Sequence, residues 1–126
     1  MAAPKDLKYT KTHEWVRFLG DGTALTGFAD YAQDALGDLV FMNAPAEGDS
    51  VTAGEPYGDI ESVKAVSDVY SPVTGIIIEV NEDVVDDPAK INADPYGSWI
   101  IKIGEITGQG ELLDADAYDQ LCEEEA

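Results

Sequence analysis

The chain has 126 residues, of which 26 are aspartate or glutamate and seven are lysine or arginine, so its formal net charge is −19. This charge excludes nucleic acids and anionic membranes as partners, because their phosphates and acidic headgroups repel it. The apolar fraction of 44%, the single cysteine and the lack of an apolar run near the ~20 residues of a membrane span predict one soluble domain over residues 1–126, without an internal disulfide.

Strands and a tight turn are expected in the first part of the chain. Aromatic and β-branched residues predict a strand over 9–19, "GDG" at 20–22 predicts a turn, and "TALTGF" at 23–28 predicts the returning strand. The apolar stretch 39–42 predicts another short strand, and Val51 opens the next one.

A short helix is expected in "DYAQDALG", between these strands. Asp30 is predicted to cap it, since aspartate side chains accept hydrogen bonds from the free amides of a first helical turn. Ala32 and Leu36 are four residues apart and share one face. Gly37 is predicted to end the helix.

The middle of the chain predicts a β-hairpin with a lysine at its tip. "DIESV" and "AVSDVYSP" are predicted strands on either side of Lys64, and "VTGIIIEV" at 73–80 is the clearest buried strand of the sequence. Gly54 and Gly75, each predicted to mark a turn, lie 10 and 11 residues from Lys64, which indicates a weak internal symmetry.

After this strand, residues 81–97 are polar and rich in turn residues, which predicts a long surface loop with a little local structure. "SWIIKI" at 98–103 predicts a strand of alternating faces. Its expected arrangement places Trp99, Ile101 and Ile103 on one face and Ile100 and Lys102 on the other.

A helix is expected at the end of the chain. Its predicted cap is Asp114 or Asp116, and its predicted apolar face consists of Ala117, Leu121 and Cys122. Residues 1–6 and 123–126 are expected to be frayed ends, because three acids at a helix C-terminus oppose its dipole. Many short strands with frequent turns and few helices predict a mainly β sandwich or barrel.

Catalytic and metal-binding sites are not expected. His13 is the only histidine, so any triad needs it, and no nucleophile motif accompanies it or Cys122. One histidine and one cysteine cannot build a zinc site by themselves, and no stretch has the spacing of a calcium loop. The scattered carboxylates are interpreted as a solvated surface.

Lys64 allows two interpretations. It is either an ordinary exposed hairpin lysine or a lysine presented for covalent modification. Its neighbours Val63 and Ala65 suit a tight, uncrowded turn, and Glu61 lies three residues before it, where a modifying enzyme would contact it. An amide on its amine would take the formal net charge from −19 to −20, since one positive charge would be lost.

The stretch "IESVKAVSDVYSPVTG" resembles the lipoylation motif of the glycine cleavage system H proteins. The related biotinyl domains carry methionine beside the modified lysine, where this chain has Val63 and Ala65. From about Leu7 onward the resemblance continues in order through "THEWV", "DYAQDALGDLVF", "VNEDVVDDP", "NADPYG", "WIIKI" and "LLDADAYDQLCEEE".

The resemblance implies a barrel-sandwich hybrid of the lipoyl/biotinyl type, with two small antiparallel sheets, a short internal helix and a C-terminal helix. It also implies a covalent carrier rather than an enzyme, with lipoate on Lys64. The implied role is to take the aminomethyl group from glycine decarboxylase (P protein) to the tetrahydrofolate-dependent aminomethyltransferase (T protein). Dithiol electrons then go to dihydrolipoamide dehydrogenase (L protein), and a lipoyl-attaching enzyme is a further implied partner.

Site residues follow from the same resemblance. Gly48, Glu61 and Gly75 stand where the family has its recognition residues around the lysine. In the family the loaded arm folds back into a cleft, whose lining here would include Thr12, His13, Glu14 and Asp68. Glu14 and Asp68 would hold the cationic aminomethyl group there and protect it from hydrolysis.

Two other functions stay open at this point. One is an H-like protein acting in lipoate relay or another lipoyl-dependent system without glycine turnover, and the other is an unmodified acidic scaffold. The chain departs from the family pattern at Phe28-Ala29 and Asn43-Ala44. These departures are expected to affect the surfaces that contact partner proteins more than modification of the lysine. We expect a monomer in the bacterial cytoplasm, or alternatively in the mitochondrial matrix after removal of a targeting peptide.

Overall fold

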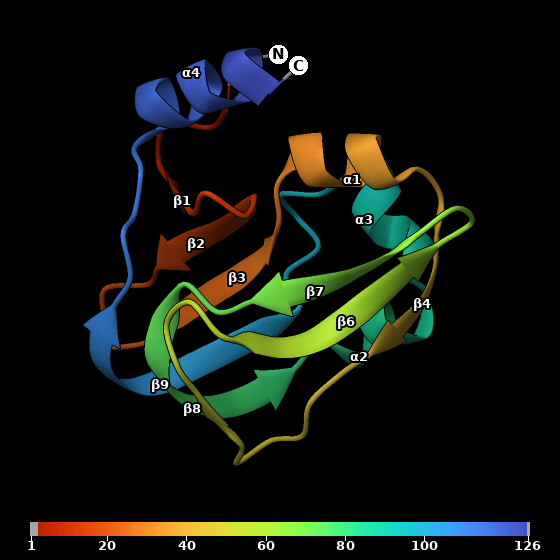
Figure 1. Ribbon diagram of the computed structural model, residues 1–126. Coiled ribbons are helices and arrows are strands. Elements are labelled where there is room, and N and C mark those ends of the chain that lie inside the picture. Colours follow the sequence, from red (N-terminus) through yellow and green to blue (C-terminus); the bar gives the residue numbers. More distant parts are fainter. Residues whose placement is uncertain (1–2, 126) are drawn as a thin grey trace.

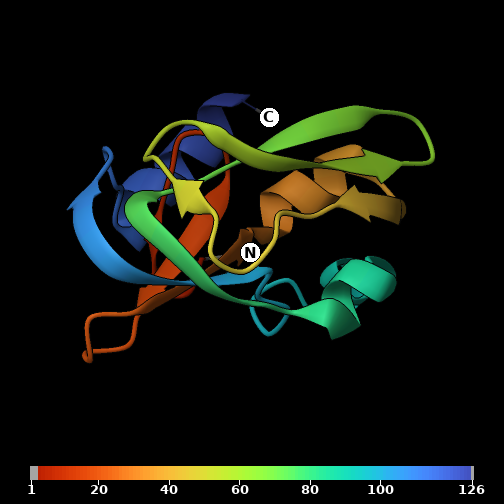
Figure 2. The same cartoon turned by 90° about the horizontal axis from the view of Figure 1, so that it is seen from below.

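The protein is described by a computed structural model that covers residues 3–125 and contains two antiparallel sheets. The larger sheet has the order β1-β2-β3-β9-β8-β5 and the smaller one the order β4-β6-β7. Figure 2 shows the β6–β7 hairpin and the long strands β8 and β9 on opposite sides of the molecule. The strands of the larger sheet are β1 (Lys8–Tyr9), β2 (Glu14–Phe18), β3 (Ala24–Phe28), β5 (Ser50–Val51), β8 (Val73–Val80) and β9 (Ile101–Gln109).

The smaller sheet and the helices complete the fold. The mainly β prediction, with two antiparallel sheets, a short internal helix and a C-terminal helix, is confirmed. Figure 1 shows α4 at one end of the molecule, and the β6–β7 hairpin reaching away from it. The remaining elements are β4 (Leu39–Asn43), β6 (Pro56–Ser62), β7 (Val66–Tyr70), α1 (Asp30–Leu36), α2 (Glu82–Asp86), α3 (Ala89–Ala93) and α4 (Ala115–Glu125).

Two apolar clusters hold these elements together. The main core contains residues of both sheets, and its most buried members include Ile60, Val69, Ile77 and Ile103. Removing such side chains from water is the main favourable contribution to folding, about 1.5–3 kcal/mol for each. The second cluster lies under α4 and contains Leu7, Tyr9, Trp15, Ala115 and Tyr118.

The hairpin expected at the start of the chain is confirmed, with a difference in its first strand. β2 and β3 pair antiparallel, with Trp15 opposite Gly27. Residues 9–19 do not form one strand, because the chain turns between β1 and β2, where His13 has a φ of 70°. β1 then pairs back on β2, so that Tyr9 lies opposite Trp15.

Helix α1 begins one residue earlier than its predicted cap implies. The N-cap is Ala29, without a side-chain cap, and Asp30 is the first helical residue. The Asp30 carboxylate instead accepts a 2.8 Å hydrogen bond from the side-chain amide nitrogen (Nε2) of Gln33. Gly37 ends the helix as predicted, with a φ of 84° that favours glycine.

The segment 81–97 contains more regular structure than the long surface loop with a little local structure that its sequence predicts. It contains the two short helices α2 and α3, which bury Val84 and Ile91 in the main core. Each of these five-residue helices has one buried side chain, Val84 in α2 and Ile91 in α3, and most of its other residues are exposed. Single apolar residues in a polar segment carry no visible periodicity, which is why the sequence did not indicate these helices.

The expected alternation along 98–103 is wrong at Ile100. Ile100, Ile101 and Ile103 are all buried in the main core. The regular part of β9 begins only at Ile101, and Ile100 is placed by its own amide, which donates a 2.8 Å hydrogen bond to the Thr26 carbonyl.

Helix α4 is capped by Asp114, the first of the two predicted candidates, whose carboxylate accepts a 2.8 Å hydrogen bond from the Ala117 amide. Its buried residues are Ala115 and Tyr118, with Leu121 and Cys122 partly buried beside them. Ala117 is exposed, so its predicted place on the apolar face is wrong.

The chain ends were expected to fray, and their outermost residues, 1, 2 and 126, lie outside the described residues. Within the described part, Ala3 is buried and its amide donates a 2.9 Å hydrogen bond to Asp119 on α4. α4 itself continues to Glu125. Among the helices between residues 3 and 125, none has the length and apolar character required to traverse a lipid bilayer.

Candidate functional site

Lys64 lies at the tip of the β6–β7 hairpin, as the sequence predicts, and its side chain is exposed. The Ser62 side chain organises the turn. Its hydroxyl oxygen accepts hydrogen bonds from the amides of Lys64 (3.2 Å) and Ala65 (3.0 Å), and the Ser62 amide donates to the Ala65 carbonyl (2.8 Å). The lysine is therefore held by a hydrogen-bonded turn rather than by a loose loop.

The tip is also attached to the segment that follows α1. The Val63 amide donates a 3.0 Å hydrogen bond to the Asp38 carbonyl. The Lys64 side chain passes over Gly37, and its Cε lies 3.6 Å from where a Cβ on that glycine would be. A Cβ at this distance would make only an ordinary contact; the lysine stem simply lies close to Gly37.

The charge of Lys64 has no close partner. Among residues 3–125, no ion pair joins Lys64 to a carboxylate, and Glu61 does not contact it through a hydrogen bond. Glu61 lies on β6, opposite Val66 of β7 and Phe41 of β4. Glu61 is partly buried, and its carboxylate makes no ion pair or side-chain hydrogen bond with another residue between 3 and 125.

Gly48 and Gly75 have backbone roles in the larger sheet rather than on the lysine hairpin. Gly48 has a φ of 91°, and its amide donates a 2.8 Å hydrogen bond to the Ile77 carbonyl of β8. The predicted turn at Gly75 is wrong, because Gly75 lies within β8. A Cβ there would meet the Gly104 carbonyl oxygen of β9 at 2.5 Å, so the two strands approach too closely for any side chain. Their part in recognition of Lys64 stays a prediction.

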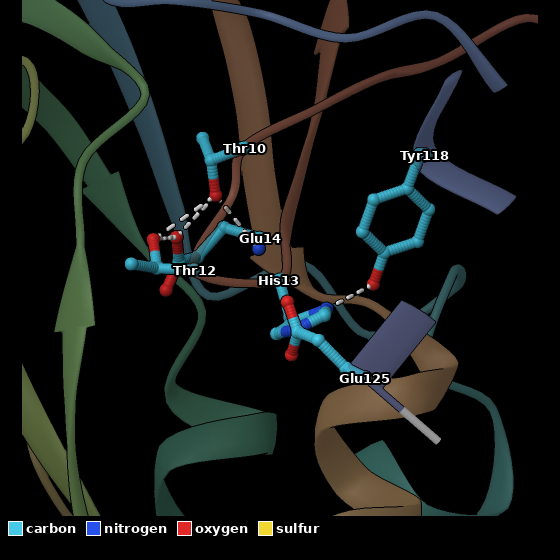
Figure 3. A network of polar contacts seen from close by, with 6 residues as sticks. All are labelled: Thr10, Thr12, His13, Glu14, Tyr118 and Glu125. Carbon is cyan, nitrogen blue, oxygen red and sulfur yellow. Dashed lines mark hydrogen bonds and ion pairs between the residues drawn. The ribbon is translucent and has the colours of Figure 1, made fainter. Parts of the chain in front are cut away.

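Glu14 is fully buried at the start of β2 and accepts several hydrogen bonds (Figure 3). The Thr10 hydroxyl donates at 2.6 Å and the Thr12 hydroxyl donates to the same carboxylate oxygen, while the Tyr70 amide of β7 donates at 3.3 Å to the other. Burial raises the pKa of Glu14 from 4.5 to about 7, against the opposing effect of these hydrogen bonds. Near neutral pH this carboxyl therefore exchanges readily between its charged and neutral forms.

The His13 side chain points away from the side chains of Thr12 and Glu14, although His13 is between them in sequence (Figure 3). Its Nδ1 is 2.7 Å from the Tyr118 hydroxyl and its Nε2 is 2.9 Å from Glu125, both on α4. The ring also stacks on Tyr31 of α1 at 4.6 Å. The structure thus brings Thr12 and Glu14 together and directs His13 to the helix packing.

Asp68 is exposed on β7, directly opposite Asp59 of β6. It is four residues after Lys64 and two before Tyr70, whose amide contacts Glu14. Along the hairpin tip and β7 the chain therefore passes from Lys64 to Asp68 and then to Tyr70, which contacts the predicted residue Glu14.

Three residues near Glu14 were not expected from the sequence. Thr10 and Tyr70 hydrogen-bond its carboxylate, and Tyr57 has a buried hydroxyl without a hydrogen-bond partner in the described part of the chain. Burial, and secondarily the Glu14 charge, raises the pKa of Tyr57. No pattern in the sequence signals Tyr70 and Tyr57, because they are 56 and 43 residues from Glu14. Thr10 is only four residues from Glu14, and the turn between β1 and β2 brings the two side chains together.

A pocket of about 350 Å³ opens beside this network. Its walls come from the turn before β2, from the β7–β8 junction and from the segment before α4. They include Thr10, Thr12, Tyr70, Ser71 and Pro72. Within residues 3–125 no group of histidine, cysteine and carboxylate side chains is arranged to hold a metal ion.

Two antiparallel sheets around one core, with a single lysine presented on a rigid hairpin tip, define a barrel-sandwich hybrid of the lipoyl/biotinyl type. The model of the family "Glycine cleavage H-protein" matches residues 7–125. The chain therefore belongs to the glycine cleavage H-protein family.

Named relatives agree with this assignment. The glycine cleavage system H protein of Lachnoclostridium phytofermentans is 53% identical over 99% of this chain and 98% of the relative. That of Burkholderia ambifaria is 52% identical over 95% of this chain and 97% of the relative. The crystal structure of a glycine cleavage system H protein from Mycobacterium marinum superposes with a TM-score of 0.89 at 45% identity, covering 93% of this chain and 96% of that one.

Proposed function

We propose that this chain is the lipoylated carrier of a glycine cleavage system and that Lys64 is its attachment point. The observation that carries the proposal is the exposed lysine, without an ion pair to any residue between 3 and 125, on a hydrogen-bonded hairpin tip in a member of the H-protein family. The reported relatives are named for glycine cleavage, which favours this role over lipoate relay.

Attachment is an acyl transfer to the Lys64 amine. The neutral Nζ forms a bond to the carbonyl carbon of an activated lipoyl group, the bond to the leaving group breaks with its electron pair, and Nζ loses one proton. The site fits such a product, because the tip is exposed and no ion pair within residues 3–125 holds the Lys64 amine. The attached dithiolane would supply the sulfur that carries an aminomethyl group and, later, two electrons.

The protein itself is a carrier and not an enzyme under this proposal. Its partners are glycine decarboxylase (P protein), the tetrahydrofolate-dependent aminomethyltransferase (T protein), dihydrolipoamide dehydrogenase (L protein) and a lipoyl-attaching enzyme. What this chain contributes is a rigid mount for the arm and an acidic surface that attracts basic partner surfaces at a distance. Bacterial relatives support a bacterial cytoplasmic location for the protein, and we expect a monomer.

The loaded arm is proposed to lie along β7 toward Thr12, Glu14 and Asp68. Twelve bonds separate the Lys64 Cα from the nearest dithiolane sulfur, a reach of about 15 Å from ordinary bond lengths. Asp68 is four strand residues from Lys64, about 13 Å along the strand, and Tyr70 is about 20 Å away. Asp68 is thus within reach of the extended arm, whereas Tyr70, and the buried Glu14 carboxylate that its amide contacts, lie beyond that reach along the strand, so a contact with Glu14 would require the hairpin tip to move toward it.

This cleft role is tested by the double variant Glu14→Ala with Asp68→Ala. If the two carboxylates shield a cationic aminomethyl group, the loaded variant is expected to release ammonia faster than the wild type. A loss of about 1.4 kcal/mol of interaction free energy between the carboxylates and this group corresponds to an increase of about tenfold in rate. Ammonia release is followed after loading with glycine, with Asp34→Ala on the exposed side of α1 as the control. An unchanged release rate refutes the cleft role but leaves the carrier role intact.

The carrier role is tested at Lys64. Incubation with a lipoyl-attaching enzyme and activated lipoate is expected to raise the intact mass of the wild type by one lipoyl group, and to leave Lys64→Arg unchanged. The lipoylated wild type then supports exchange of bicarbonate into the glycine carboxyl with a decarboxylase, and Lys64→Arg does not. Exchange activity in Lys64→Arg, or a second modified lysine, contradicts the proposal.

A further inference from the structure

The short connection between α1 and β4 supports the hairpin tip that carries Lys64. The Val63 amide donates a 3.0 Å hydrogen bond to the Asp38 carbonyl, and the Lys64 stem lies close to Gly37. Figure 1 shows the tip of the β6–β7 hairpin on the same side of the molecule as α1 and α3. We call residues 37–39, which are this connection and the first residue of β4, the platform.

One side chain of α3 holds the platform at both of its ends. The Asn92 Oδ1 accepts a 2.9 Å hydrogen bond from the Leu39 amide, and the Asn92 Nδ2 donates a 3.0 Å hydrogen bond to the Gly37 carbonyl. Nδ2 also donates a 2.8 Å hydrogen bond to Oε1 of Gln33 on α1. Both polar atoms of this half-buried amide are therefore used, and both of its bonds to the platform are made to backbone groups.

These contacts form a continuous path from the main core to the hairpin tip. Ile91, the residue before Asn92, is fully buried in the main core, so the Asn92 amide extends from a well-packed element. Asp38 lies between the two platform residues that Asn92 holds, and its carbonyl accepts from Val63. Hydrogen bonds weaken steeply as they depart from linearity, so a platform fixed on both sides of Asp38 keeps that carbonyl directed at the tip.

We propose that Asn92 is a positioning residue for Lys64, an inference that rests on the proposed function. The Ser62 hydroxyl shapes the turn from within, whereas Asn92 fixes where the tip lies relative to the rest of the molecule. The acylating enzyme then meets the lysine amine already in place. A loose tip would have to be ordered when the carrier binds, and fixing flexible backbone costs free energy for each residue that is ordered.

The first test follows the tip itself in protein that has not been modified. Asn92→Ala removes all three side-chain hydrogen bonds, so amide hydrogen exchange at Val63 is expected to become about tenfold faster. Exchange within β8 and β9 should stay unchanged, because the pairing of these two strands does not involve the platform.

Asn81→Ala is the matched control. Asn81 is also half-buried, and its Nδ2 donates a 2.8 Å hydrogen bond to the Trp99 carbonyl rather than to the platform. The substitution removes an amide of the same kind at the other end of the segment 81–97, so it is expected to leave exchange at Val63 unchanged. Equal exchange rates at Val63 in the two variants overturn the inference.

Asn92→Asp separates the positioning role from a simple loss of packing. The aspartate has the same shape and still accepts from the Leu39 amide, but it cannot donate to the Gly37 carbonyl while it is ionised. Protection of the Val63 amide is therefore expected to return as the pH falls through about 4, where aspartate becomes protonated. Asn92→Ala should gain no protection over this range, and identical pH profiles of the two variants overturn the role of the Nδ2 donor.

The second test measures lipoylation by intact mass, with the attaching enzyme and activated lipoate. Asn92→Ala is expected to lower kcat/KM at Lys64 about fivefold or more, and Asn81→Ala by less than about twofold. The loss should lie in KM rather than in kcat, because a loose tip is ordered when the carrier binds.

Faster exchange at Val63 without a change in kcat/KM overturns the inference, since the fixed tip would then not serve modification of the lysine. Equal effects of Asn92→Ala and Asn81→Ala on kcat/KM overturn it as well. If the wild type itself is not lipoylated, the proposed function fails, whereas exchange at Val63 still decides whether Asn92 holds the tip.

Discussion

Glu14 shows how strongly a single buried carboxyl can be altered by its surroundings. It has no exposed surface, and burial raises its pKa to about 7 although three hydrogen bonds favour the charged form. Folding therefore increases its affinity for a proton. The stabilising contribution is complete below pH 4.5, where the unfolded chain is protonated as well, and it is lost as the pH rises through about 7.

Glu14→Gln is expected to remove this pH dependence. A glutamine oxygen still accepts from Thr10 and Thr12 but does not titrate. A shift from 4.5 to about 7 corresponds to about 3 kcal/mol at 1.36 kcal/mol per unit. Urea unfolding between pH 4.5 and 8 should show the wild type losing about that much relative to Glu14→Gln. Parallel stability curves for the two proteins would contradict the raised pKa.

At the scale of elements, α4 is attached mainly by aromatic contacts to the start of the chain. Tyr118 stacks on Tyr9 at 4.4 Å, and its hydroxyl is 2.7 Å from the His13 ring. His13 also contacts Glu125 and stacks on Tyr31, so its ring connects α1 with α4. The only histidine of the chain thus has a structural place between two helices.

His13→Asn is expected to loosen α4 without disturbing the sheets. Asparagine tolerates the positive φ of 70° at this position but lacks the ring that packs on Tyr31. Amide hydrogen exchange should become faster within α4 and stay unchanged in β8 and β9. Glu125→Gln, which keeps a hydrogen-bond acceptor for the ring, serves as the control. Uniformly faster exchange in all elements would show that the variant lowers global stability instead.

At the scale of the whole molecule, the charge of −19 opposes the compact state by self-repulsion. Lys5, Lys11 and Arg17 form ion pairs with acids, but these pairs are largely exposed. Exposed pairs contribute only about 0–1 kcal/mol each. Most of the acidic charge is therefore not compensated within the molecule.

Added salt is consequently expected to stabilise the protein. Raising NaCl from about 0.01 M to about 0.3 M shortens the screening length from about 30 Å to below 10 Å. We expect the Tm to rise by about 5 °C, equivalent to about 1 kcal/mol for a domain of this size. Sucrose of equal osmolality is the control, because it does not screen charge. A Tm that is independent of salt would show that the acids are too far apart to repel each other.

Local features of this protein were determined by its sequence alone. The hairpin with Lys64 at its tip, the end of α1 at Gly37 and the cap of α4 at Asp114 depend on residues close together in the chain. Turn and cap chemistry acts over a few residues, so it can be recognised without the fold. The mainly β class followed in the same way, from the number and spacing of short apolar stretches.

The tertiary structure alone decided which distant residues meet. The Tyr70 amide that donates a hydrogen bond to Glu14 is 56 residues away in the chain. Phe41, Glu61 and Val66 lie in one row only because three strands pair in one register. The separation of His13 from Thr12 and Glu14 depends on a single positive φ and on the packing of α4. Pairing register and helix packing are set by the whole core, and a shift of one residue would exchange the two faces of each strand. The sequence thus determined where the lysine is presented, and the fold determined what surrounds it.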